Sequence, residues 1–129
     1  MKKILLASVS LILLASCAHR GDEVYKACTL TKQEQTSYAD NTPIAIAAPT
    51  FAGMDTRLQK ARDAHVSGCA SVGFQIDGNG NPYNITVVKE APKGYGFGDE
   101  AVFQIQNTKY TPPTKANELY FVGNSWRNP

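Results

Sequence analysis

The sequence predicts an α+β fold in which two helices pack on one face of a small three-stranded antiparallel sheet. Three observations support this prediction. Apolar residues alternate with small or polar residues from Ala70 to Ile76, other apolar residues recur at helical spacing in two segments, and turn-forming residues separate these stretches. With 129 residues, 19% charged and 43% hydrophobic, the chain can form one compact domain and has the composition of an ordinary folded protein.

The first helix is predicted over residues 56–66. Thr56 and Gln59 have the spacing of a capping box, and Gly68 is suited to stop the helix. The residues that recur at helical spacing are Leu58, Ala61 and His65. We interpret His65 as a half-buried residue of this helix, because no other histidine, cysteine or carboxylate has the spacing to form a site with it.

A β-hairpin is predicted next, with strands Ala70–Asp77 and Tyr83–Lys89. The alternation in the first strand is typical of a half-buried strand, and Ile85 and Val87 should face inward on the second. Residues 77–81 read Asp-Gly-Asn-Gly-Asn, and Gly and Asn tolerate the positive φ angles of tight turns. The same residues resemble the start of a calcium loop, but Pro82 stands where such a loop needs glycine.

A second helix is predicted to begin after Asp99 as its N-cap and to end near Thr108. Its apolar residues are Ala101, Val102 and Ile105. The glycines of residues 94–98 precede it, but they lack the lysine and later glycine of phosphate-binding loops and are interpreted as a flexible turn. The third strand, about Glu118–Gly123, is short.

No pattern in the sequence pairs a nucleophile with a base or groups metal ligands, so we expect neither an enzyme nor a bound metal or cofactor. Removal of residues 1–16 would take away Lys2 and Lys3 and lower the basic count from 13 to 11, against 11 acidic residues. A formally neutral chain without a basic stripe is not expected to bind nucleic acid.

The N-terminus has the pattern of a bacterial lipoprotein signal. Lys2 and Lys3 precede the apolar run 4–15, which is shorter than the roughly 20 residues that cross a bilayer. The Leu-Ala-Ser-Cys sequence ending at Cys17 resembles the motif whose cysteine is acylated and becomes the new N-terminus. Residues 1–16 should therefore be a signal peptide and Cys17 the lipid attachment site; the alternatives are a plain secreted protein or a buried cysteine.

The residue after the cysteine is Ala18. By resemblance to known lipoproteins, this favours a lipid-anchored protein of the outer membrane that faces the periplasm. Cys28 and Cys69 would then share an oxidising compartment and are predicted to form one disulfide, with two separate buried thiols as the alternative.

The order helix, strand, Asp-Gly turn, strand, Pro, helix, Pro, strand resembles the TonB C-terminal domain over about residues 49–129. Positions that match the family in the first strand and the turn are Gly68, Val72, Phe74, Ile76 and Asp77. In the return strand and beyond, the matching positions are Asn84, Ile85, Val87, Pro92, Tyr110 and Pro112. The departures are Pro82, Glu90 and Thr108, the last standing where the family has Trp.

This resemblance implies a protein-binding domain that recruits an envelope protein or peptide by strand addition to an open sheet edge. The family's usual partner-facing edge is the C-terminal strand, so the candidate residues are Leu119, Tyr120, Phe121 and Val122. The same edge could also form a homodimer. Residues 17–48 would be an N-terminal tether to the domain at 49–129.

TonB-type transducers keep an uncleaved N-terminal helix and a long proline-rich spacer, whereas this chain has a lipoprotein signal pattern and seven scattered prolines. The predicted function is therefore a lipid-anchored envelope binding module. An accessory role in TonB-dependent transport and a purely structural envelope lipoprotein are the alternatives.

Overall fold

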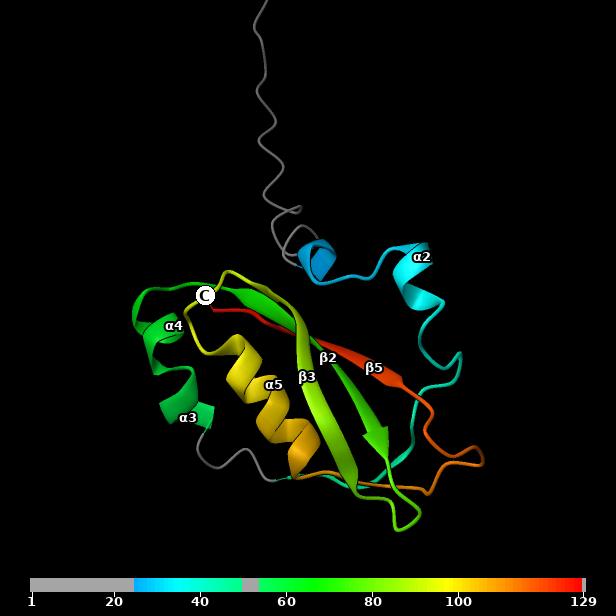
Figure 1. Ribbon diagram of the computed structural model, residues 1–129. Helices are drawn as coiled ribbons and strands as arrows, with labels where there is room; N and C mark the ends of the chain where they lie inside the picture. Colours follow the sequence, from blue (N-terminus) through cyan, green and yellow to red (C-terminus); the bar gives the residue numbers. More distant parts are fainter. Residues whose placement is uncertain (1–24, 50–53, 129) are drawn as a thin grey trace, which may run out of the picture.

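A three-stranded antiparallel sheet forms the centre of the molecule, with the strands in the order β3-β2-β5 (Figure 1). The computed structural model describes residues 25–49 and 54–128. The sheet strands are β2 (Gly68–Ile76), β3 (Pro82–Ala91) and β5 (Tyr120–Trp126). A second, two-stranded sheet pairs β1 (Ala45–Ala47) with β4 (Lys109–Tyr110). After helical residues 25–27, the helices are α2 (Lys32–Gln35), α3 (Met54–Arg57), α4 (Gln59–Asp63) and α5 (Phe97–Gln106).

Helix α5 packs on one face of the sheet, with α3 and α4 beside it, which confirms the predicted α+β fold (Figure 1). The core on this face includes the alternating residues of β2, namely Ala70, Val72, Phe74 and Ile76. Ala101 and Ile105 from α5 and Tyr120 from β5 complete it. Ile85 packs against this core as predicted, and Val87 contacts the helix at Gly98 while remaining 37% exposed.

The other face of β2 is also buried, so the prediction of a half-buried strand is wrong. Cys69 and Ser71 are completely inaccessible, although they point away from α5. Residues 25–42, which we call the arm, cover this face. The Ser71 hydroxyl donates to the carbonyl of Cys28, and the ring of Tyr38 lies over Gly73. Alternation in one strand cannot reveal that a distant segment buries its polar face.

The first helical segment differs from its prediction. Instead of one helix over residues 56–66, two short helices are interrupted at Leu58, whose φ and ψ are −102° and 10°. Leu58 is the N-cap of α4 without a side-chain capping bond, so the predicted capping box is absent. His65 is exposed with a φ of 53°, which ends the helical region before Gly68.

Gly68 begins β2, and a side chain there would overlap the ring of Phe97. Phe97 in turn stacks on Trp126 at 5.7 Å between ring centroids. With this packing, α5 begins at Phe97, two residues before the predicted N-cap Asp99. β5 continues to Trp126, beyond the predicted end near Gly123. The sequence pattern therefore located both elements but shifted their bounds.

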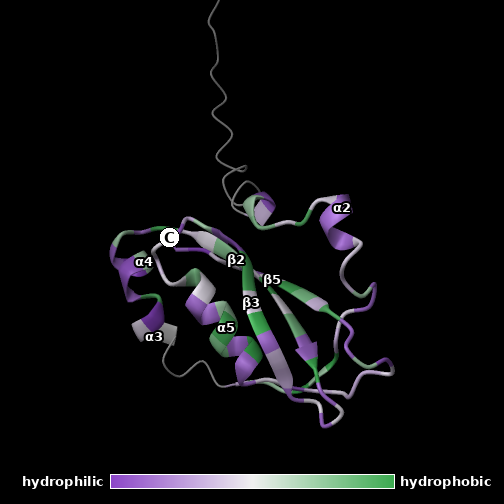
Figure 2. Ribbon diagram, in the orientation of Figure 1, coloured by the Kyte–Doolittle hydropathy of each residue, from purple (hydrophilic) through white to green (hydrophobic). Residues whose placement is uncertain are grey.

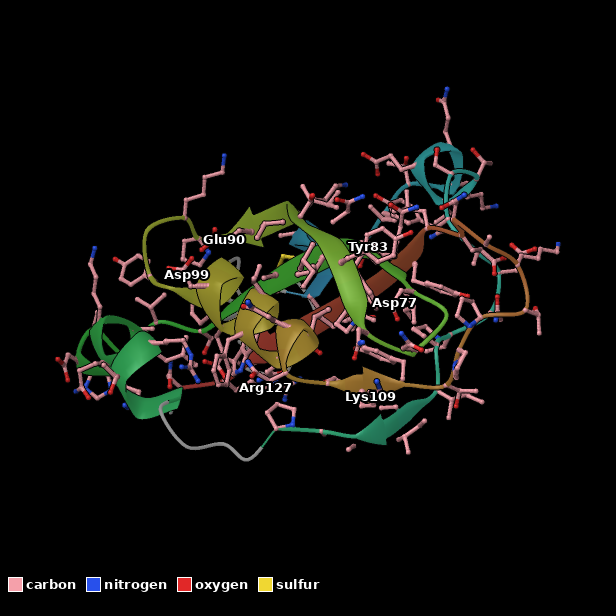
Figure 3. All side chains as sticks on the ribbon, turned by 60° about the horizontal axis from the view of Figure 1, so that its bottom comes forward. Asp77, Tyr83, Glu90, Asp99, Lys109 and Arg127 are labelled. Carbon is pink, nitrogen blue, oxygen red and sulfur yellow. A yellow bond between two sulfur atoms is a disulfide. The ribbon has the colours of Figure 1, made fainter. Side chains whose placement is uncertain are left out.

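The N-terminus of α5 is held by a side chain from β3. Gly96 is the N-cap in the left-handed conformation, and the Glu90 carboxylate accepts from the amide of Gly98 at 3.1 Å. In Figure 3, Glu90 lies beside the start of α5, near Asp99. A carboxylate at this end of a helix is favourable, because it bonds an unsatisfied amide and faces the positive end of the dipole. The departure of Glu90 from the family pattern thus has a structural role.

The hairpin turn forms as predicted. The Asp77 amide donates to the carbonyl of Asn81 at 2.9 Å, and the Asp77 carboxylate accepts from the amides of Asn79 and Asn81 at 2.9 Å each. The tip packs on β4, since Tyr110 donates to the carbonyl of Gly80. A side chain at Gly80 would overlap the Tyr110 backbone, and its φ of 82° also requires glycine.

Candidate functional site

The two edges of the main sheet differ in regularity. β5 pairs with β2 without a register shift, from Gly68 opposite Trp126 to Phe74 opposite Tyr120. β3, on the other side of β2, begins at Pro82, carries Asn84 at a φ of 50° and has two register irregularities. Bulges and proline protect an edge from further pairing, whereas a regular edge accepts another strand. β5 is therefore the edge suited to strand addition.

Three residues of β5 direct their backbone groups away from the sheet. The carbonyl of Leu119 accepts from the amide of Ala39, so it points away from β2. The amide of Asp77, just after β2, bonds Asn81 on the β3 side. Backbone groups of successive strand residues point to opposite sides, so Ile76 and every second residue before it in β2 bond toward β5. Their partners in β5 face β2, and the residues between those partners face outward. Phe121, Gly123 and Ser125 consequently face outward, and none of them bonds the backbone of another described residue outside the strand ladders.

The predicted edge residues lie at the beginning of this strand. Tyr120 and Val122 direct their backbone toward β2, and the Tyr120 side chain is buried in the core. Leu119 uses its carbonyl to bind the arm, and the ring of Phe121 packs on Tyr38 at 5.3 Å. Of the four, only Phe121 has outward backbone groups that no described residue occupies.

The sequence analysis missed Gly123 and Ser125, which continue the open edge toward the C-terminus. The apolar run that marked the strand ends at Val122, so it gave no sign of these two residues. The length of the predicted partner strand was the available signal, because an edge strand can pair along the whole of its neighbour. β5 continues through polar residues because it pairs with the whole of β2. Beyond the strand, the Asn128 amide donates to the Ser67 hydroxyl at 2.9 Å and anchors the chain end.

A cavity of about 310 Å³ adjoins this edge on the face of the sheet that carries the arm. Phe121, Gly123 and Asn124 line it from β5, and Ser71 lines it from β2. The rest of the lining comes from the arm, including Tyr25, Tyr38 and Asp40. The open edge and the cavity therefore share one strand.

The predicted disulfide between Cys28 and Cys69 is present, with the two Cα atoms 6.0 Å apart. It attaches the arm to the start of β2 on the face opposite α5. Cys17, the predicted lipid attachment site, lies outside the described residues. Within residues 25–49 and 54–128, no group of acidic, histidine and cysteine side chains could hold a metal ion. Over the same residues, no helix is long and apolar enough to span a membrane.

A small α+β domain with a regular edge strand to which no other described strand pairs has the architecture of a protein-interaction domain. Residues 59–122 match the family described as the Gram-negative bacterial TonB protein C-terminal, and this part of the chain belongs to that family. Domains of this family are non-enzymatic and interact with proteins, so the chain is a TonB-related protein of the bacterial cell envelope. No curated protein matches the chain.

Proposed function

We propose that this protein is a lipid-anchored envelope lipoprotein whose TonB C-terminal-like domain captures an extended segment of an envelope protein by strand addition to β5. The observation that carries the proposal is the set of outward backbone groups on Phe121, Gly123 and Ser125. Three alternate residues provide main-chain donors and acceptors for a short added strand. A regular register over the whole of β5 keeps these groups in line.

The proposed division assigns residues 1–16 to the signal peptide, 17–48 to the N-terminal segment and 49–129 to the binding domain. Acylation at Cys17 would hold the protein at the outer membrane, facing the periplasm. Cys17 is eleven residues before Cys28, where the disulfide fastens the arm to the sheet. An extended chain of that length spans at most about 40 Å, so the binding edge would work close to the membrane surface.

Ser125 offers a clean test, because its amide faces outward. Ser125→Pro removes this donor at an edge position, where proline is tolerated, and Ser125→Val keeps the donor as the matched control. A photo-crosslinking residue at the exposed position Arg127 in cells would report partners, identified by mass spectrometry of the crosslinked peptide. We expect a defined crosslink to an extended segment, retained in Ser125→Val and lost in Ser125→Pro.

If the crosslinks are unchanged in a folded Ser125→Pro protein, strand addition is wrong and a structural lipoprotein is the better description. A crosslink to a second copy of this chain, with a dimeric mass in detergent, would identify the homodimer instead. A crosslink to an outer-membrane receptor would favour the accessory role in TonB-dependent transport.

A further inference from the structure

The cavity beside β5 is built mainly by the arm, which precedes the family match at residues 59–122. The middle of the arm is fixed to β3, because the Lys89 ammonium donates to the carbonyl of Thr29 and to the Glu34 carboxylate, at 3.0 Å each. The arm then returns to β5, where Ala39 donates to the carbonyl of Leu119. The arm therefore contacts both sides of the sheet, and Phe121, Gly123 and Asn124 of β5 border the cavity between these contacts.

Gly123 forms part of the floor of this cavity. A Cβ atom there would lie 3.4 Å from the Ser71 hydroxyl and 4.0 Å from the Phe121 ring, so the missing side chain leaves space directly beside the open edge. Successive side chains of a strand point to opposite faces. An added strand would thus place every second side chain on the arm face, where the one beside Gly123 meets the cavity.

The lining favours a positively charged group. The cavity is lined by the aromatic residues Tyr25, Tyr38 and Phe121 and by the acidic residue Asp40, and no Lys, Arg or His of the described residues is in the lining. Tyr25 is 55% exposed, so part of its ring is available to a ligand. Aromatic faces and a carboxylate both attract ammonium and guanidinium groups. The volume is at the lower limit of about 300 Å³ for small-molecule sites, which suits one long side chain.

We propose that this cavity is a specificity pocket for a Lys or Arg side chain of the segment that adds to β5. The proposal rests on the proposed function, since the edge brings the side chain to the pocket. It assigns the arm a role in partner selection that strand addition alone does not require. Backbone pairing would provide affinity for any extended segment, and Asp40 with the aromatic rings would select the basic one.

The probe is a series of fluorescein-labelled peptides of about nine residues, alternating Thr and Val, with Lys, Arg, Ala or Glu at the centre. Binding to the full mature protein in detergent is measured by fluorescence anisotropy. We expect the Lys and Arg peptides to bind at least about tenfold more tightly than the Glu peptide. Asp40→Asn should reduce this preference to about twofold or less.

Gly123→Val fills the floor while keeping the outward amide, so it should abolish the preference for the Lys peptide over the Ala peptide. Gly78→Val in the hairpin turn is the matched control, because that glycine has open space around it and lies outside both the edge and the lining; it should keep the preference. Circular dichroism establishes that each variant is folded.

The outcomes separate the two proposals. Equal affinity for all four central residues, with binding lost in Ser125→Pro, would overturn the pocket and leave strand addition standing. A preference that survives both Asp40→Asn and Gly123→Val would also overturn it. Failure of every peptide to bind the parent protein would overturn the proposed function and the pocket together.

Discussion

The amide of Ala39 donates to the carbonyl of Leu119 at 2.8 Å and joins the arm to the residue that precedes β5. This bond occupies the first outward acceptor of the C-terminal strand. A partner strand can therefore pair only farther along, at Phe121, Gly123 and Ser125. The arm both shortens the open edge and builds the cavity beside it.

Amide hydrogen exchange should reproduce the alternation along β5. The amides of Val122 and Asn124 bond β2 and should exchange at least about a hundredfold more slowly than those of Gly123 and Ser125, because opening a paired strand requires local unfolding. NMR exchange spectra of the free protein measure each amide separately. Equal protection of neighbouring amides would show that the outer edge is already occupied.

Substitution of Cys17 should release the protein from the membrane. Cys17→Ser removes the thiol that would be acylated, and the loss of the acyl chains eliminates an anchor of about 0.8 kcal/mol per buried CH₂ group. Labelling with a palmitate analogue and fractionation of the envelope measure the effect, and Cys28→Ala is the control that keeps Cys17. Unchanged labelling in Cys17→Ser would exclude this residue as the attachment site.

Loss of the disulfide should destabilise the domain by about 3–4 kcal/mol, because the bond closes a long loop in the unfolded chain. The bond joins residues 41 positions apart. Urea unfolding of the Cys28→Ala/Cys69→Ala variant measures the difference in free energy. Reductant should lower the stability of the parent by a similar amount and leave the variant unaffected; a parent whose intact mass does not change on reduction would contradict the bond.

The ion pair between Arg57 of α3 and Glu100 of α5 should be important for stability. Glu100 is 1% exposed and Arg57 24%, and the guanidinium also lies 3.5 Å above the Phe103 ring centre. Arg57→Met leaves the buried carboxylate with the Gln104 side-chain amide but without its cationic partner, and should destabilise by about 3 kcal/mol, the lower end for a broken buried pair. Chemical denaturation is the measurement.

The double variant Arg57→Met/Glu100→Leu should be more stable than Arg57→Met alone, since it removes the unpaired charge as well. With Glu100→Leu as the second single variant, these proteins form a double-mutant cycle. If the two single changes in unfolding free energy add up to that of the double variant, the pair contributes no coupling energy.

The hairpin turn should make stability depend on pH in the acid range. The amide of Asn81, and secondarily that of Asn79, holds the pKa of the Asp77 carboxylate below its usual value of 3.8. Because the folded-state pKa is lower than the unfolded one, this contribution is present above pH 3.8 and is lost as the pH falls through the folded-state pKa. Asp77→Asn cannot titrate and lacks it.

Urea unfolding of the parent and of Asp77→Asn from about pH 7 to about pH 2 gives the difference in stability. We expect that difference to be constant at neutral pH and to shrink only below the unfolded pKa. Glu34, whose pKa is lowered mainly by the amide of Thr31, titrates in both proteins and cancels in the difference. A difference that shrinks already at neutral pH would assign the effect to another group.

Large apolar side chains are exposed at and just before β1, where Ile44 and Ile46 are 68% and 63% exposed. Figure 2 shows that hydrophobic residues also continue along the middle of β3, where Val88 is 38% exposed. The pairing of β1 with β4 depends on a contact between distant parts of the chain.

The sequence by itself determined the elements whose patterns are local. The alternation from Ala70 to Ile76 set the core face of β2, Asp77 and the glycines after it set the turn, and the apolar spacing of Ala101 and Ile105 set the buried side of α5. These patterns survive folding because one strand or helix turns the same side chains toward the same face wherever it packs. The pairing of the two remaining cysteines followed from their number and expected compartment.

Only the tertiary structure decided which part of β5 is open. The break at Leu58, the early start of α5 at Phe97 and the burial of Ser71 all result from contacts between residues far apart in the sequence. The same is true of the edge, because the arm binds the carbonyl of Leu119, whereas no residue within 25–49 and 54–128 bonds the outward backbone groups of Gly123 and Ser125. Local periodicity determines the face of a strand or helix on which a side chain lies. The residues that contact that face depend on packing between segments far apart in the sequence.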